Sequence, residues 1–94
     1  MDRTKIKQID YKVPGGKLLR IKAEFKANKL TKLDITGDFF VYPEEALFEI
    51  EKILTSYHIS ELSAKLNSYL LEHEVKLIGF SVDDLLKALK KLYH

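Results

Sequence analysis

Histidine is the side chain of this 94-residue sequence best suited to catalysis or metal binding, and it occurs three times. His58, His73 and His94 lie 15 and 21 residues apart, so they form neither an HxxxH nor an HExxH arrangement. We therefore interpret each as an ordinary surface histidine and predict no metal site. The sequence has no cysteine, which excludes a thiol nucleophile and a Cys-based zinc site.

Two pairs of carboxylates and one glycine–lysine turn are the remaining candidates for chemistry. Glu44-Glu45 and Asp83-Asp84 fall where the first turn of a helix is expected, so the helix dipole explains them without acid–base catalysis. Pro14-Gly15-Gly16-Lys17 lacks the GxxxxGK[ST] spacing of a phosphate-binding loop and precedes no helix. It is interpreted as a tight hairpin, and no catalytic residue is predicted.

The composition is that of a globular protein, with 46% hydrophobic and 32% charged residues. The length fits a single domain over residues 1–94. The chain starts with no apolar segment typical of a signal peptide and has no apolar run of the roughly 18–20 residues that cross a bilayer. Together with the lack of cysteine, these features predict a cytoplasmic location and no membrane partner.

Alternation of polar and apolar residues predicts three strands in the first forty residues, with the positions Ile9, Tyr11, Val13, Leu19, Ile21, Ala23, Phe25, Leu33 and Ile35 on the buried face. Pro14-Gly15-Gly16 predicts the first turn. Ala27-Asn28-Lys29 predicts the second, with Asn28 in a left-handed conformation. The expected arrangement is an antiparallel meander with one buried and one wet face.

From Pro43 onward the apolar period changes to about 3.6, which predicts three helices. Pro43 suits the first position of the first helix, Ser60 can cap the second, and Ser81 can cap the third. The apolar stripes are Ala46, Leu47, Ile50, Ile53 and Leu54; then Leu62, Leu66, Tyr69 and Leu70; then Val82, Leu85, Leu86, Leu89 and Leu92.

The order of the elements predicts an α+β fold. We expect an antiparallel three-stranded sheet with three helices packed on one face. Residues 74–80 are ambiguous, because Val75, Leu77 and Gly79 could form a short extra strand or an extended connection.

Charge is unevenly distributed along the chain, although the net charge is only +2. Residues 1–42 hold ten Lys or Arg and five Asp or Glu, whereas residues 43–94 hold six and nine. One interpretation is that lysines cover the solvated faces of the strands. The other is a basic sheet face that meets an acidic partner or a phosphate ligand. Nucleic acid is not predicted as a partner, because no exposed aromatic residues interleave with the basic ones.

The least ordinary segment joins the last strand to the first helix, and its candidate partner-contact residues are Gly37, Asp38, Phe39, Phe40 and Tyr42. Two adjacent phenylalanines cannot both face one side of an extended chain. One of them must point away from the core, or the strand must bulge there, which Gly37 would permit. The alternatives are a bulge with a hydrophobic staple on the first helix, and a contact with a partner.

Residues 18–54, and above all Gly37-Asp38-Phe39-Phe40 followed by the helix, resemble the C-terminal accessory domain of lipoate–protein ligases. Helices over residues 59–71 and 82–92 extend the resemblance to most of the chain. It implies a non-catalytic small subunit that acts with a large catalytic subunit in the ATP-dependent activation of lipoate to lipoyl-AMP. The ATP, lipoate and Mg would be bound in the complex and not by this chain alone, and lipoyl-acceptor domains would be indirect partners.

Two other functions remain open from the residues alone. The first is a stand-alone interaction or nucleic-acid-binding module that uses the basic sheet face. The second, an independent small enzyme, has little support because no base–nucleophile pair or metal cluster is visible.

Overall fold

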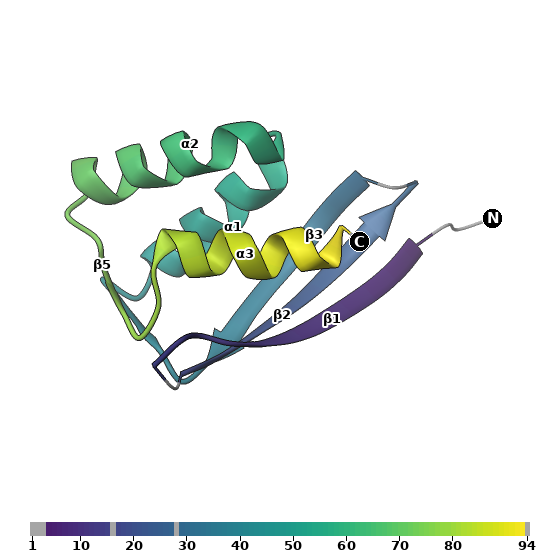
Figure 1. The fold of residues 1–94 in the computed structure, drawn as a ribbon. Coiled ribbons are helices and arrows are strands. Elements are labelled where there is room, and N and C mark those ends of the chain that lie inside the picture. Colours follow the sequence, from purple (N-terminus) through teal and green to yellow (C-terminus); the bar gives the residue numbers. More distant parts are fainter. Residues whose placement is uncertain (1–3, 16, 28, 94) are drawn as a thin grey trace.

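The computed structural model describes residues 4–15, 17–27 and 29–93 (Figure 1). Its elements are β1 (Thr4–Lys12), β2 (Leu18–Lys26), β3 (Lys29–Gly37), β4 (Phe40–Tyr42), α1 (Ala46–Ser56), α2 (Ile59–Glu72), β5 (Lys76–Ile78) and α3 (Val82–Leu92). β1, β2 and β3 form an antiparallel sheet in that order, and β4 pairs with β5 in a second, two-stranded sheet. The predicted α+β fold is confirmed, and the ambiguous segment contains a strand.

The buried face of the three-stranded sheet follows the predicted alternation. Leu19, Ile21, Ala23 and Phe25 of β2 are all buried. The sheet register places Ile9 opposite Ile21 on one side of β2, and Ile35 opposite Ile21 on the other. These apolar side chains therefore form one continuous layer of the core.

The end of the β2–β3 hairpin departs from simple alternation. The register shifts between Glu24 and Phe25, so that Glu24 faces Lys32 whereas Phe25 faces Leu30. Thr31 is the extra residue of this bulge, and its hydroxyl donates to the carbonyl of Glu24 at 3.0 Å. Ala27 has a positive φ of 50°. The conformation predicted for Asn28 lies outside the described residues.

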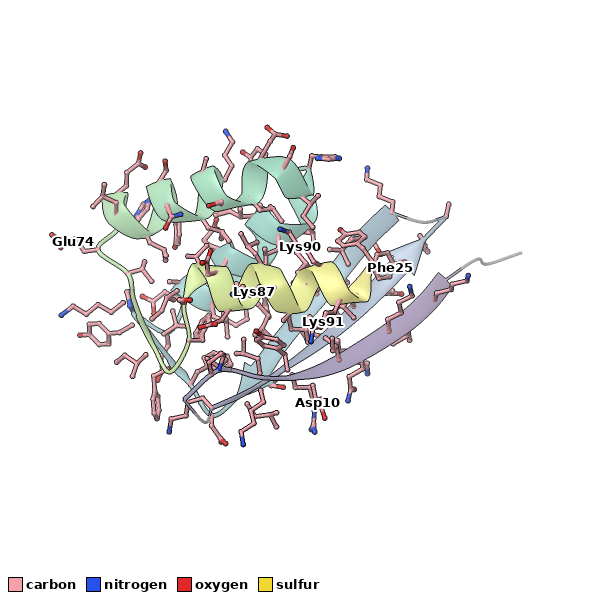
Figure 2. All side chains as sticks on the ribbon, viewed as in Figure 1. Asp10, Phe25, Glu74, Lys87, Lys90 and Lys91 are labelled. Atoms are coloured by element: carbon pink, nitrogen blue, oxygen red, sulfur yellow. The ribbon has the colours of Figure 1, made fainter. Side chains whose placement is uncertain are left out.

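The three helices cover the same face of the sheet, in two layers (Figure 1). α1 packs on β3, and α3 packs on β1 and β2. α2 packs on α1 and α3, and Figure 1 shows it on the side of these two helices that faces away from the sheet. At the end of α3, Phe25 meets Tyr93 edge to face, with ring centroids 5.7 Å apart, and Figure 2 shows Phe25 on the helix side of the sheet.

Two of the three predicted helix starts are wrong in detail. α1 begins at Ala46 and not at Pro43, because residues 43–45 form tight turns in which the amide of Ala46 donates to the carbonyl of Pro43 at 3.0 Å. α2 is capped by His58 and not by Ser60, since the His58 imidazole accepts the Ser60 amide at 3.2 Å. An imidazole nitrogen thus does the work expected of a hydroxyl.

The third predicted start is confirmed. The Ser81 hydroxyl accepts the Asp84 amide at 3.2 Å, and the Asp84 carboxylate accepts the Ser81 amide at 2.9 Å. This reciprocal capping box gives Asp84, the second carboxylate of the Asp83-Asp84 pair, a structural role.

Gly37 ends β3 at a point where no other residue fits. Its φ is +149°, and a Cβ on it would overlap the carbonyl oxygen of Leu18 on the neighbouring strand. Gly15 in the first hairpin also has a positive φ, +104°, but a Cβ there would meet nothing within 4 Å. Replacing Gly37 would thus cost both a steric overlap and a strained backbone, whereas replacing Gly15 would cost only the strained backbone.

We expect Gly37→Ala to lower the free energy of unfolding by about 2 kcal/mol or more, because it adds overlap to strain. The control Gly15→Ala should cost only about 1 kcal/mol, since it adds strain alone. Urea denaturation followed by circular dichroism measures both changes. Equal losses would contradict the steric argument.

Glu51 of α1 holds the outer edge of the sheet. Its carboxylate accepts the backbone amide of Ile35 in β3 at 2.8 Å. Partial burial raises the pKa of Glu51 above its ordinary value near 4.5, the bond from Ile35 opposes this, and the nearby charge of Asp34 adds to it. Because the folded-state pKa is raised, the protonated form of Glu51 favours folding and the ionised form weakens it.

The contribution of Glu51 to stability should therefore be lost as the pH rises from below 4.5 through the raised folded-state pKa of this carboxyl. Glu51→Gln keeps an oxygen that can accept the Ile35 amide, but its side chain does not ionise. We expect this variant to gain stability relative to the unmodified chain over that pH range, as measured by urea denaturation at each pH. A stability difference that is independent of pH would refute the raised pKa.

Candidate partner-binding surface

The candidate site begins where the chain passes from one sheet to the other. After Gly37, the amide of Asp38 donates to the carbonyl of Leu18 at 3.2 Å, and the chain then enters β4. β4 and β5 pair with Phe40 opposite Ile78, Val41 opposite Leu77, and Tyr42 opposite Lys76. We call these two strands the β4–β5 ribbon.

Phe39 and Phe40 face opposite ways, so one of them points away from the core, which is one of the two arrangements predicted from the sequence. Phe39 is half-buried and packs edge to face on the buried Phe80, with centroids 4.8 Å apart. Phe40 is 72% exposed. Val41 is buried and Tyr42 is 68% exposed, so the ribbon has an inner face on the core and an outer face in solvent.

An open groove of about 890 Å³ lies between the outer face of the ribbon and α1. Its exposed apolar side chains are Phe40 and Tyr42 of β4, Ile78 of β5, and Phe48 of α1. Phe48 is 73% exposed and Ile78 is 54% exposed. Exposed aromatic and aliphatic groups gathered in this way are typical of a surface that meets another protein.

Of the five candidate contact residues, the structure brings only two to the outer face of the ribbon. Phe40 and Tyr42 line the groove as exposed side chains. Phe39 belongs mainly to the core, and Gly37 serves the sheet-to-sheet passage. Asp38 is exposed, but its part in a partner contact stays a prediction.

Sequence reasoning missed Phe48 and Ile78, although both left a signal. Phe48 lies outside the apolar stripe of its helix, so a large aromatic residue stands on the polar side of α1. Ile78 falls between Leu77 and Gly79 in a predicted strand, which places it on the face opposite Leu77.

A second open groove, of about 980 Å³, adjoins the first across Tyr42 and Lys76, which line both. It lies between the ribbon and α2, and the exposed Leu71 is part of its lining. The apolar surface around the ribbon therefore continues from α1 to α2.

The titratable side chains of the described residues lie at or near the surface. No buried polar or charged side chain is found in this part of the chain, and no group of three or more His, Asp or Glu side chains could hold a metal ion there. His58 caps α2, and the His73 ring lies 4.7 Å from the Tyr69 ring at the other end of that helix. His94 lies outside the described residues.

The outer face of the three-stranded sheet carries acids among an excess of bases, with Lys12, Arg20, Lys22, Lys26 and Lys32 against Asp10, Glu24 and Asp34. Arg20 donates two hydrogen bonds to the carboxylate of Asp10, at 2.8 and 3.1 Å, and these bonds hold the pKa of Asp10 below its ordinary value. Figure 2 shows Asp10 on the side of the sheet away from the helices. The register also places acids opposite bases, in the pairs Lys22 with Asp34 and Glu24 with Lys32.

Replacing each phenylalanine in turn tests the division between core and surface. We expect Phe39→Ala to lower the free energy of unfolding by about 2–3 kcal/mol, because it removes the contact with Phe80. Phe40→Ala should change it by less than about 0.5 kcal/mol, since the side chain is already solvated. Urea denaturation measures both, and a loss from Phe40→Ala as large as that from Phe39→Ala would contradict the assignment.

The fold and this surface define an α+β domain with an exposed apolar groove between the β4–β5 ribbon and α1. Within the described residues, no helix is both long and apolar enough to cross a membrane. No protein-family model matches the chain.

Two comparisons identify what the chain is similar to. Lipoate-protein ligase A subunit 2 from Thermoplasma acidophilum is 25% identical over 81 residues, which are 86% of this chain and 84% of that protein. A solved chain shares the fold with a TM-score of 0.73 and 22% identity, over 95% of this chain and 97% of that one. Its structure is described as an archaeal lipoylation system, a bi-partite lipoate protein ligase and its E2 lipoyl domain from Thermoplasma acidophilum. The resemblance predicted from the sequence is confirmed.

Proposed function

We propose that this chain is the non-catalytic small subunit of a two-component lipoate–protein ligase, acting with a large catalytic subunit in the ATP-dependent activation of lipoate to lipoyl-AMP. The observation that carries the proposal is similarity along nearly the whole chain to the second subunit of such a ligase. The fold shared with a chain from a bi-partite lipoate protein ligase structure agrees with the proposal. We place this chain in the cytoplasm, where ATP for the reaction is available.

The chemistry is proposed to belong to the large subunit, which would bind ATP, lipoate and Mg. Adenylation needs lipoate and ATP held in line and shielded from water. The small subunit would supply this by docking beside the pocket and ordering its loops. Transfer of the lipoyl group to an acceptor domain would then be carried out by the large subunit, so acceptor domains would be indirect partners of this chain.

The competing function, a nucleic-acid-binding module on the sheet, has weaker support. Such a module needs a basic surface that neutralises phosphates. The outer sheet face instead pairs Arg20 with Asp10 and sets Lys22 and Lys32 opposite acids. The most exposed aromatic side chains of the described residues, Phe40, Tyr42 and Phe48, lie on another part of the molecule, around the groove.

We expect the large subunit alone to catalyse lipoate-dependent exchange between ATP and pyrophosphate about tenfold more slowly, or worse, than it does with this chain present. The exchange of radiolabelled pyrophosphate into ATP measures this. This chain by itself is the control and should give no exchange. Equal rates with and without it would end the proposal.

Supplying preformed lipoyl-AMP separates the two half-reactions. Transfer to a lipoyl-acceptor domain should then depend much less on this chain, because the activation step has been bypassed. Mass spectrometry of the acceptor lysine measures the transfer. An equally strong dependence in this assay would move the role of the chain from activation to transfer.

A further inference from the structure

We propose that the groove between the β4–β5 ribbon and α1 is the docking site for an apolar segment of the large subunit that carries Lys or Arg beside its apolar residues. This inference rests on the proposed function, because it identifies the surface through which that function would operate. The groove combines a preformed apolar floor with an acidic rim, and each feature restricts the occupant.

The floor is built from exposed apolar side chains on elements that are anchored to the core. Phe40 and Ile78 are opposite each other in the ribbon register, so they present one joint apolar surface. Buried Val41 anchors this ribbon to the core, and buried Ala46 and Ile50 anchor α1, whose opposite side carries Phe48. A partner segment would therefore cover these side chains without first having to order the backbone that carries them.

The rim is acidic. Glu44 and Glu45 line the groove, and both are exposed. Within the described part of the chain the one ion pair joins Arg20 and Asp10, so neither glutamate is paired with a described residue. Lys76 is the one base among the described groove residues. The two acids leave the rim with a net negative charge, which favours a cationic neighbour.

The backbone at this end of α1 argues against a phosphate ligand. The amides of Ala46, Leu47 and Phe48 donate to the carbonyls of residues 43–45, at 3.0, 3.1 and 3.2 Å. These amides are the donors that a helix N-terminus normally offers to an anion. With the donors engaged and two carboxylates beside them, the groove disfavours ATP and favours a basic polypeptide segment.

A second copy of this chain is a poorer occupant. In a two-fold dimer the same patch faces itself, so Glu44 and Glu45 of one copy would approach those of the other. One lysine per copy, Lys76, would have to offset both acids. The large subunit is not subject to this constraint.

Titration calorimetry of the full chain with the large subunit tests the apolar floor. The variant combines Phe40→Ala with Phe48→Ala, and the matched control is Ile6→Ala, since Ile6 is 64% exposed on the outer face of the sheet. We expect the groove variant to bind at least tenfold more weakly and the control to bind within about twofold of the unmodified chain. Circular dichroism checks that both variants remain folded.

A charge experiment tests the rim without touching the apolar packing. The variant combines Glu44→Gln with Glu45→Gln, and the control combines Glu61→Gln with Glu72→Gln on the exposed side of α2, which removes the same charge. Binding of the unmodified chain should weaken as salt rises. This dependence should be reduced in the rim variant and kept in the control.

The results of these binding experiments either support or overturn the proposed docking site. Weaker binding by the groove variant and a reduced salt dependence in the rim variant, with both controls unaffected, support the inference. Binding by every variant as tight as that of the unmodified chain overturns the inference and leaves the proposed function standing. Failure of the unmodified chain to bind the large subunit overturns both. A dimer of this chain that the groove variant dissociates, with binding to the large subunit unchanged, assigns the groove to a second copy and overturns the inference.

Discussion

The close approach of Gly37 to the backbone of Leu18 is the contact on which the position of the groove depends. A side chain at residue 37 would overlap the Leu18 carbonyl oxygen, which also accepts the amide of Asp38. The chain leaves the three-stranded sheet at this contact and starts a second sheet three residues later. Phe39 is thereby directed onto Phe80, and Phe40 is left in solvent. A single backbone contact thus separates the core of the domain from its exposed apolar surface.

Most of the fold could be predicted because local periodicity and tertiary burial agree. The alternation in β2 and the stripe of α3 were both confirmed by the buried side chains. The layering of the helices could not be predicted, because α2 and α1 have similar stripes although α2 packs on helices and α1 on a strand. The predicted helix starts at Pro43 and Ser60 were wrong because of local hydrogen bonds. The carbonyls of residues 43–45 accept amides in tight turns before α1 begins, and the imidazole of His58 caps α2 in place of the Ser60 hydroxyl.

The candidate site could be predicted only in part, because it joins residues that are distant in sequence. The segment around Phe40 was recognised from two adjacent phenylalanines in an extended chain. Ile78 reaches the same surface through strand pairing, which the sequence left ambiguous. Phe48 reaches the same surface because of the way α1 is rotated about its axis when it packs on the sheet, and the sequence does not reveal this rotation. The uneven charge along the sequence left two interpretations open, and the pairing of individual charges came only from the strand register, which sets Lys22 beside Asp34 and Arg20 beside Asp10.

The bond from Ile35 to Glu51 has a consequence for how the molecule can assemble. Strand β3 is an outer strand, and its unpaired backbone groups could template the addition of a strand from another molecule. At Ile35 the donor needed for that growth is already taken by Glu51. On the opposite border, β1 carries Lys5, Lys7 and Lys12, and like charges on two such borders repel each other. Extension of the sheet into fibrils or strand-swapped pairs is thereby discouraged, so association through side chains becomes the easier route.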